Sequence, residues 1–104
     1  MKHVAVIGAG TMGNGIAHTF AQNGFKVQLI DVSESALGKA IGTISENLDR
    51  MVAKDFIPEA KKIETLSNIT TFTDIKAGGQ HANLVIEAAS ENVGLKLDLF
   101  KQLD

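Results

Sequence analysis

Six residues near the N-terminus, Gly8-Ala9-Gly10-Thr11-Met12-Gly13, constrain the fold of this chain more than any other feature. They match the pattern G-x-G-x-x-G, which is weak evidence by itself. Here the apolar run 4–7 precedes the pattern, a helical pattern over 11–22 begins within it, and Asp31 ends the next apolar run. A strand, a glycine turn, a helix and a later acid together predict a dinucleotide-binding unit.

Each glycine of this pattern has a distinct physical role. Gly8 permits the tight turn, Gly10 leaves room for a pyrophosphate against the backbone, and Gly13 lets the helix pack closely on the strand. The free N–H groups and the dipole of the helix N-terminus then favour a bound anion. The cofactor-binding turn that we predict comprises Gly8, Ala9, Gly10, Thr11, Met12 and Gly13.

Asp31 stands where an acid can accept hydrogen bonds from the ribose hydroxyls of a dinucleotide. Its negative charge would repel a 2′-phosphate, and the next residues, Val32 and Ser33, include no Arg to reverse that preference. We therefore predict NAD rather than NADP as the cofactor. The alternative is that the glycines form an ordinary turn and Asp31 is a solvated strand end.

Four strands are predicted, at 4–7, 25–30, 69–72 and 84–86. The first and fourth are continuous apolar runs typical of buried strands. The second has apolar Val27, Leu29 and Ile30, and the third is rich in β-favouring Thr. Helical patterns lie between them, and Asn23-Gly24 provides a helix stop at the end of the first. The alternation predicts an α/β fold with right-handed crossovers, namely a Rossmann-like parallel sheet of order 3-2-1-4. Gly78-Gly79 is predicted to break the chain before the fourth strand. As the last strand of an incomplete domain, the fourth strand is expected to present an open edge.

A protruding pair of helices is predicted between the second and third strands. Ser33 is a good N-cap for a long helix to about Ala53, and Pro58 suits the first position of a shorter one. The long helix carries an apolar stripe of Leu37, Ile41, Ile44, Leu48 and Met51. In the shorter helix we expect Ile63 and Leu66 to point inward. A closing helix is predicted from Leu95, Leu99, Phe100 and Leu103.

Composition narrows the classes of partner. Ten Lys and Arg against twelve Asp and Glu give a net charge of −2, which argues against broad nucleic-acid binding. No signal peptide or membrane span is predicted, and the absence of cysteine makes a cytoplasmic location the expectation. No metal site is expected, because His3, His18 and His81 have no partners at ligand spacing.

Two segments together resemble the 3-hydroxyacyl-CoA dehydrogenase family, especially the short bacterial 3-hydroxybutyryl-CoA dehydrogenases. They are VIGAGTMGNGIAHTFAQNGFKVQLIDVS at the front and LVIEAASENVGLKLDLFKQLD at the back, and the helical pair between them is also a family feature. The resemblance spans essentially the whole chain. It implies oxidation of a 3-hydroxyacyl-CoA to the 3-oxoacyl-CoA with NAD, or the reverse reduction.

The resemblance also implies roles for single residues. Glu91 and Lys96 would contact NAD, in addition to the glycine turn and Asp31. Lys54 matches a Lys that helps bind coenzyme A, and Asn47 replaces a Ser of some members. Arg50, one turn before Lys54, could add positive charge for the CoA phosphates. The alternative for Arg50 and Lys54 is a solvated helix face.

Residues 1–104 are therefore expected to form the N-terminal part of an NAD-binding Rossmann domain, incomplete in itself. The resemblance implies that the catalytic His and Glu, and a helical domain that forms a homodimer, belong to a part outside this chain. Two other classes stay open. One is a β-hydroxyacid or 6-phosphogluconate-type dehydrogenase, and the other is a non-catalytic NAD-binding protein.

Overall fold

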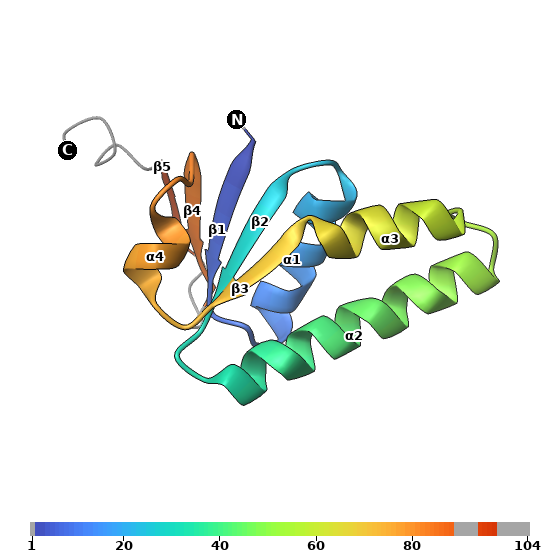
Figure 1. Cartoon of the computed structure of the whole chain (residues 1–104), viewed down its shortest axis with the longest axis horizontal. Coiled ribbons are helices and arrows are strands. Elements are labelled where there is room, and N and C mark those ends of the chain that lie inside the picture. The colour runs from blue at the N-terminus through green and yellow to red at the C-terminus, as the bar shows by residue number, and fades with distance from the viewer. Residues whose placement is uncertain (1, 89–93, 98–104) are drawn as a thin grey trace.

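The computed structural model describes residues 2–88 and 94–97, which form a five-stranded sheet with helices packed on it (Figure 1). The strands lie in the order β3-β2-β1-β4-β5. The first four are parallel, which confirms the predicted order 3-2-1-4. Their bounds are β1 His3–Ile7, β2 Lys26–Ile30, β3 Ile69–Phe72, β4 Leu84–Glu87 and β5 Gly94–Leu97.

Strand β1 is central and pairs with segments from opposite ends of the chain. Val4 is in register with Val27 of β2 on one side and with Leu84 of β4 on the other. The Asn83 side chain accepts hydrogen bonds from the backbone N–H groups of Lys2 and His3, at 3.2 Å each. The start of β1 is thus fixed by a residue just before β4.

Of the four helices in the described part of the chain, three follow the predicted pattern. These are α1 Thr11–Gln22, α2 Glu34–Ala53 and α3 Glu59–Ser67. Asn23 caps α1, and Gly24 takes a φ of 93°, in the left-handed region that ends helices. The Ser33 hydroxyl accepts a hydrogen bond from Ala36 N at 3.1 Å, so the predicted N-cap of α2 is confirmed.

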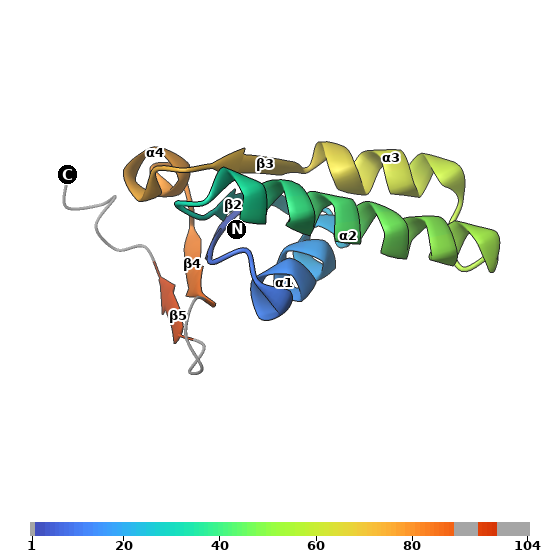
Figure 2. The ribbon, with the colours of Figure 1, turned by 90° about the horizontal axis from the view of Figure 1, so that it is seen from below.

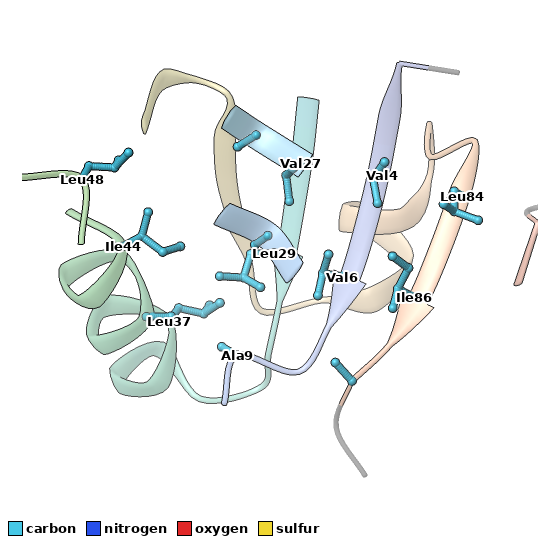
Figure 3. Close-up of a cluster of buried hydrophobic side chains, with 14 residues drawn as sticks. Val4, Val6, Ala9, Val27, Leu29, Leu37, Ile44, Leu48, Leu84 and Ile86 are labelled. Atoms are coloured by element: carbon cyan, nitrogen blue, oxygen red, sulfur yellow. The ribbon is translucent and has the colours of Figure 1, made fainter. Parts of the chain in front are cut away.

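The main core lies between α1, α2 and one face of the sheet (Figure 3). Alternate strand residues point to this face, as the period of two requires. The predicted stripe of α2 meets them: its buried members are Leu37, Ile44 and Leu48, with Met51 packed at the margin. The sheet residues of this core are Val4, Val6, Val27, Leu29, Leu84 and Ile86.

Helices α2 and α3 run side by side and project past the sheet (Figures 1 and 2), as predicted for the helical pair. An ion pair between Lys62 of α3 and Asp49 of α2 joins them. Pro58 is the N-cap of α3 rather than its first residue. The prediction for Ile63 was wrong, because this side chain is 63% exposed and Thr65 is the buried residue of α3. Nine residues are too few for periodicity to decide which face of a helix packs.

Gly78-Gly79 does not simply break the chain, as the sequence suggested, but ends a short helix, α4 Ile75–Gly79. The Asp74 carboxylate accepts a hydrogen bond from Lys76 N at 3.0 Å and starts this helix. A Cβ at Gly78 would lie 2.6 Å from Ile30 Cγ1, so the glycine lets α4 sit directly on the second face of the sheet.

The first residues of the predicted closing helix are not helical. Gly94–Leu97 instead form the strand β5, which is antiparallel to β4. Val85 is in register with Lys96. An unpaired strand edge offers a row of backbone donors and acceptors, and Gly-Leu-Lys-Leu alternates with the period of a strand. Residues 98–104 lie outside the described residues. Within the described part, no helix is long and apolar enough to cross a membrane.

Candidate functional site

The glycine turn joins β1 to α1 at the carboxyl end of the parallel strands. Gly8 has a φ of 105°, in the region where a side chain is strained, and its N–H donates to Ile30 O at 2.7 Å. Gly10 is the N-cap of α1 in an extended conformation. The turn therefore leaves β1, contacts the end of β2 and starts α1 within three residues.

The other two glycines differ in what surrounds them. A Cβ at Gly13 would lie 1.7 Å from the carbonyl oxygen of Gly8, so only glycine fits where α1 crosses the turn. A Cβ at Gly10 would meet nothing within 4 Å. The close approach predicted at Gly13 is therefore internal to the fold. The space at Gly10 is open to a ligand.

The N-terminus of α1 carries no negative charge that would repel an anion. Its first turn contains no acidic residue, and no side chain caps it. The first N–H groups of a helix lack partners within it, and its dipole adds partial positive charge there. This end of α1 can therefore hold an anionic group such as a pyrophosphate.

The Asp31 carboxylate lies beside the turn and is held by two backbone donors. Its Oδ1 accepts from Ser33 N and its Oδ2 accepts from Ala9 N, both at 2.9 Å. These hydrogen bonds, from Ser33 first and Ala9 second, hold the pKa of the Asp31 carboxyl below its usual value, against the opposing effect of burial. A carboxylate can accept about four hydrogen bonds, so capacity remains for two ribose hydroxyls.

The bond from Ala9 to Asp31 was not foreseen from the sequence, which suggested only a ribose contact. It ties the glycine turn to the end of β2, so one carboxylate fixes the turn and keeps the capacity to accept further hydrogen bonds. Val32, which follows Asp31, is 85% exposed and carries no charge. Neither it nor Ser33 offers a cation for a 2′-phosphate.

A groove of about 500 Å³ lies between the glycine turn and α2. One wall comes from the turn and the start of α1, and the other from α2. Asn14 is 8% exposed, and its amide nitrogen donates to Ala40 O at 3.0 Å, which links the two walls. The lining residues are Ala9, Gly10, Thr11, Asn14, Gly15, Ala36, Lys39, Ala40, Thr43 and Asn47.

This groove was missed by the sequence analysis, although Asn14 gave a signal. A polar residue directly after the third glycine, on the buried side of a helix, needs a partner. Asn47, which also lines the groove, was noted only because the resemblance places a Ser of some members at this position. The side-chain oxygen Oδ1 of Asn47 accepts a hydrogen bond from the Arg50 guanidinium, which leaves the side-chain nitrogen Nδ2 of Asn47 as a donor.

The two cations predicted for coenzyme A lie further along α2, toward the tip of the helical pair. Arg50 is in the last turn of α2 and Lys54 is its C-cap, and both side chains are exposed. Four residues apart, they occupy neighbouring positions on one face of the helix. Both side chains are therefore accessible to a phosphate group.

Two further predicted residues are not placed as side chains. Glu91 lies outside the described residues, and Lys96 is described only as a backbone position in β5. Of the histidines, His3 begins β1, His18 contacts Gln22 within α1 at 2.8 Å, and His81 is exposed. In residues 2–88 and 94–97, no group of three or more His, Cys, Asp or Glu side chains could hold a metal ion.

The fold and the glycine turn together define a dinucleotide-binding domain of the Rossmann type. The family model for the 3-hydroxyacyl-CoA dehydrogenase NAD binding domain matches residues 3–104. The chain belongs to this family, and NAD is its cofactor. The family match favours the resemblance stated above over the β-hydroxyacid dehydrogenase alternative.

Individual relatives agree with the family match. The chain is 42% identical to the mitochondrial hydroxyacyl-coenzyme A dehydrogenase of Rattus norvegicus, over all of this chain and 35% of that protein. It is 39% identical to a 3-hydroxybutyryl-CoA dehydrogenase of Clostridioides difficile, over 97% of this chain and 36% of the relative. The chain thus spans about a third of the length of these relatives.

A solved structure shows the same arrangement. The (S)-3-hydroxybutyryl-CoA dehydrogenase of Ralstonia eutropha superimposes with a TM-score of 0.84 at 39% identity. The superposition covers 88% of this chain and 32% of the other.

Proposed function

We propose that the complete protein oxidises a 3-hydroxyacyl-CoA to the 3-oxoacyl-CoA with NAD, or catalyses the reverse reduction, and that this chain supplies NAD binding. The observation that carries the proposal is the groove between the glycine turn and α2, in a domain of this family. It gives an acyl-CoA a surface adjacent to the cofactor. Bound NAD would accept the hydride from the substrate.

In this proposal the residues of the chain bind NAD and orient it. Gly8 through Gly13 hold the pyrophosphate, and Asp31 accepts the ribose hydroxyls while its two backbone donors keep it ionised. Glu91 and Lys96 are proposed as further NAD contacts. None of these groups moves the substrate proton, so the chain has no proposed catalytic residue.

The proposal assigns the rest of the reaction to a larger protein. Residues 1–104 would be the N-terminal part of the NAD domain. A general-base His with its Glu, the remaining strands and a helical dimerisation domain would complete a homodimer. The relatives' greater length supports this division. A cytoplasmic location remains part of the proposal, with fluorescence imaging of the tagged complete protein as its test.

The cofactor assignment is tested by Asp31→Arg. We expect this variant to bind NADH more weakly and to shift its preference toward NADPH, because a cation replaces the charge that repels the 2′-phosphate. The measurement is titration of each nucleotide by nicotinamide fluorescence, which no Trp or Tyr of this chain obscures. An unchanged preference would contradict the ribose assignment.

The coenzyme A assignment is tested by Lys54→Glu in the complete protein. We expect a higher KM for the acyl-CoA and little change for NAD, because Lys54 lies toward the tip of the helical pair. Lys76→Glu is the matched control, since Lys76 is an exposed residue of α4 on the second face of the sheet. If Lys54→Glu and Lys76→Glu have equal KM values for the acyl-CoA, Lys54 is a surface residue with no role in coenzyme A binding.

A further inference from the structure

We propose that Lys39 binds the diphosphate of a nucleotide in the groove between the glycine turn and α2. This inference rests on the proposed function, because NAD and coenzyme A both carry a diphosphate. It goes beyond the proposed site residues, since Lys39 belongs neither to the glycine turn nor to the cations at the tip of α2.

The position of Lys39 is set by the structure that surrounds it. Lys39 lines the groove on α2, and Gly10 and Thr11 line it on the turn. The next residue, Ala40, receives the hydrogen bond from the buried amide of Asn14. The backbone beside Lys39 is therefore held against the start of α1, and the spacing of the two walls is fixed by a buried contact.

The charges of the groove favour an anion. Lys39 is the charged residue of its described lining, and no acid is among the others. Within residues 2–88 and 94–97, the ion pairs are Lys61 with Glu64 and Lys62 with Asp49, so Lys39 is not neutralised by a carboxylate there. The facing wall contributes the positive end of α1 and the open space at Gly10.

These features match a diphosphate rather than a neutral ligand. The negative oxygens of a diphosphate can reach donors on two walls of a groove, and Lys is a common phosphate-binding residue that acts as a compact charge. Asn47, further along the same wall, adds an amide donor. The groove would thus hold a phosphate chain that extends from the turn along α2.

The test compares Lys39→Met with wild type and with Lys39→Arg, in this 104-residue chain. Lys76→Met is the matched control, because it removes the same charge from the second face of the sheet. Dissociation constants are measured for NADH by fluorescence and for CoA by calorimetry, at two salt concentrations. Circular dichroism checks that each variant is folded.

We expect Lys39→Met to raise the dissociation constant of the nucleotide whose diphosphate occupies the groove by about tenfold. This is the effect of losing one charge-assisted hydrogen bond. Loss confined to NADH would assign the groove to the cofactor, and loss confined to CoA to the substrate. The affected affinity should also fall less steeply with salt in Lys39→Met than in wild type. Lys39→Arg should keep most of the affinity and the salt dependence.

The opposite results separate the two proposals. If wild type binds a nucleotide and Lys39→Met binds both as tightly, the inference is overturned while the proposed function stands. Equal losses in Lys39→Met and Lys76→Met would also overturn it, because net charge alone would explain them. If wild type binds neither nucleotide, the proposed NAD-binding role of this chain fails, and the assignment of Lys39 fails with it.

Discussion

Replacement of Gly13 by Ala would test whether the glycine turn and α1 are packed as tightly as the structure indicates. The new Cβ would lie 1.7 Å from the Gly8 carbonyl oxygen and 2.8 Å from its carbonyl carbon. Both atoms belong to the backbone, so no side-chain rotation can relieve the contact. Either α1 or the turn must move.

The expected magnitude follows from two opposing effects. Overpacking costs about 1–3 kcal/mol, and the backbone contact puts Gly13→Ala at the upper end, about 3 kcal/mol. Ala gains roughly 1 kcal/mol over Gly in a helix, which leaves a net loss of about 2 kcal/mol in the free energy of unfolding. For a domain of about 100 residues, this corresponds to a fall in Tm of about 8–16 °C.

The assay is thermal and urea unfolding followed by circular dichroism, with NADH titration of each folded variant. Gly15→Ala is the matched control, since a Cβ there meets nothing within 4 Å on the same helix. It should be stabilised by up to about 1 kcal/mol. Gly10→Ala should fold normally but bind NADH more weakly, because its methyl group occupies the ligand space. A Gly13→Ala variant with the Tm of wild type would refute the packing argument.

Two further predictions concern the residues around Asp31. Ser33→Ala removes the N-cap of α2 and should lower the free energy of unfolding by about 1 kcal/mol, measured by urea unfolding; no change would mean that the cap is replaced by water. Asp31 has a lowered pKa in the folded state, so its stabilising contribution is present above the ordinary value of 3.8 and is lost as the pH falls through the lower folded pKa. Unfolding of Asp31→Asn should therefore depend less on pH in this acid range, and a dependence equal to that of wild type would contradict the assignment.

The parts of the fold that the sequence predicts well have several agreeing signals. β1, α1 and β2 carry apolar runs, three glycines and a helix stop at Asn23-Gly24. The long helix α2 has both a capping serine and a stripe that recurs over about four turns. In each case local preference and burial favour the same structure, so the bounds agree to within a residue or so.

The errors occur where one signal decides alone. Ile63 was expected to point inward because it is apolar, but α3 packs through Thr65. The Thr65 hydroxyl can be buried because it donates a hydrogen bond to Lys61 O, one turn earlier in the same helix, at 2.7 Å. α4 has five residues, too few to show a period. The strand β5 depends on pairing with the free edge of β4, and its four-residue alternation is too short to predict a strand without that pairing.

The site shows the same division. The turn and Asp31 follow a fixed spacing and could be found by inspection. The groove depends on how α2 crosses α1, which is set by the contact between Asn14 and Ala40. Because these residues are 26 positions apart, the position of Lys39 relative to the turn becomes visible only in the folded chain.

The central position of β1 has a consequence for synthesis of the chain. Its β4 edge stays unpaired until a segment about 80 residues later has left the ribosome, as the contact of His3 with Asn83 shows. At 5–20 residues per second, that delay is about 4–16 s. During this time β1 can pair with β2, but its other edge exposes unpaired backbone N–H and C=O groups that can pair with a neighbouring chain. Nascent chains should therefore need protection from aggregation until β4 emerges, and slower translation should lengthen that need.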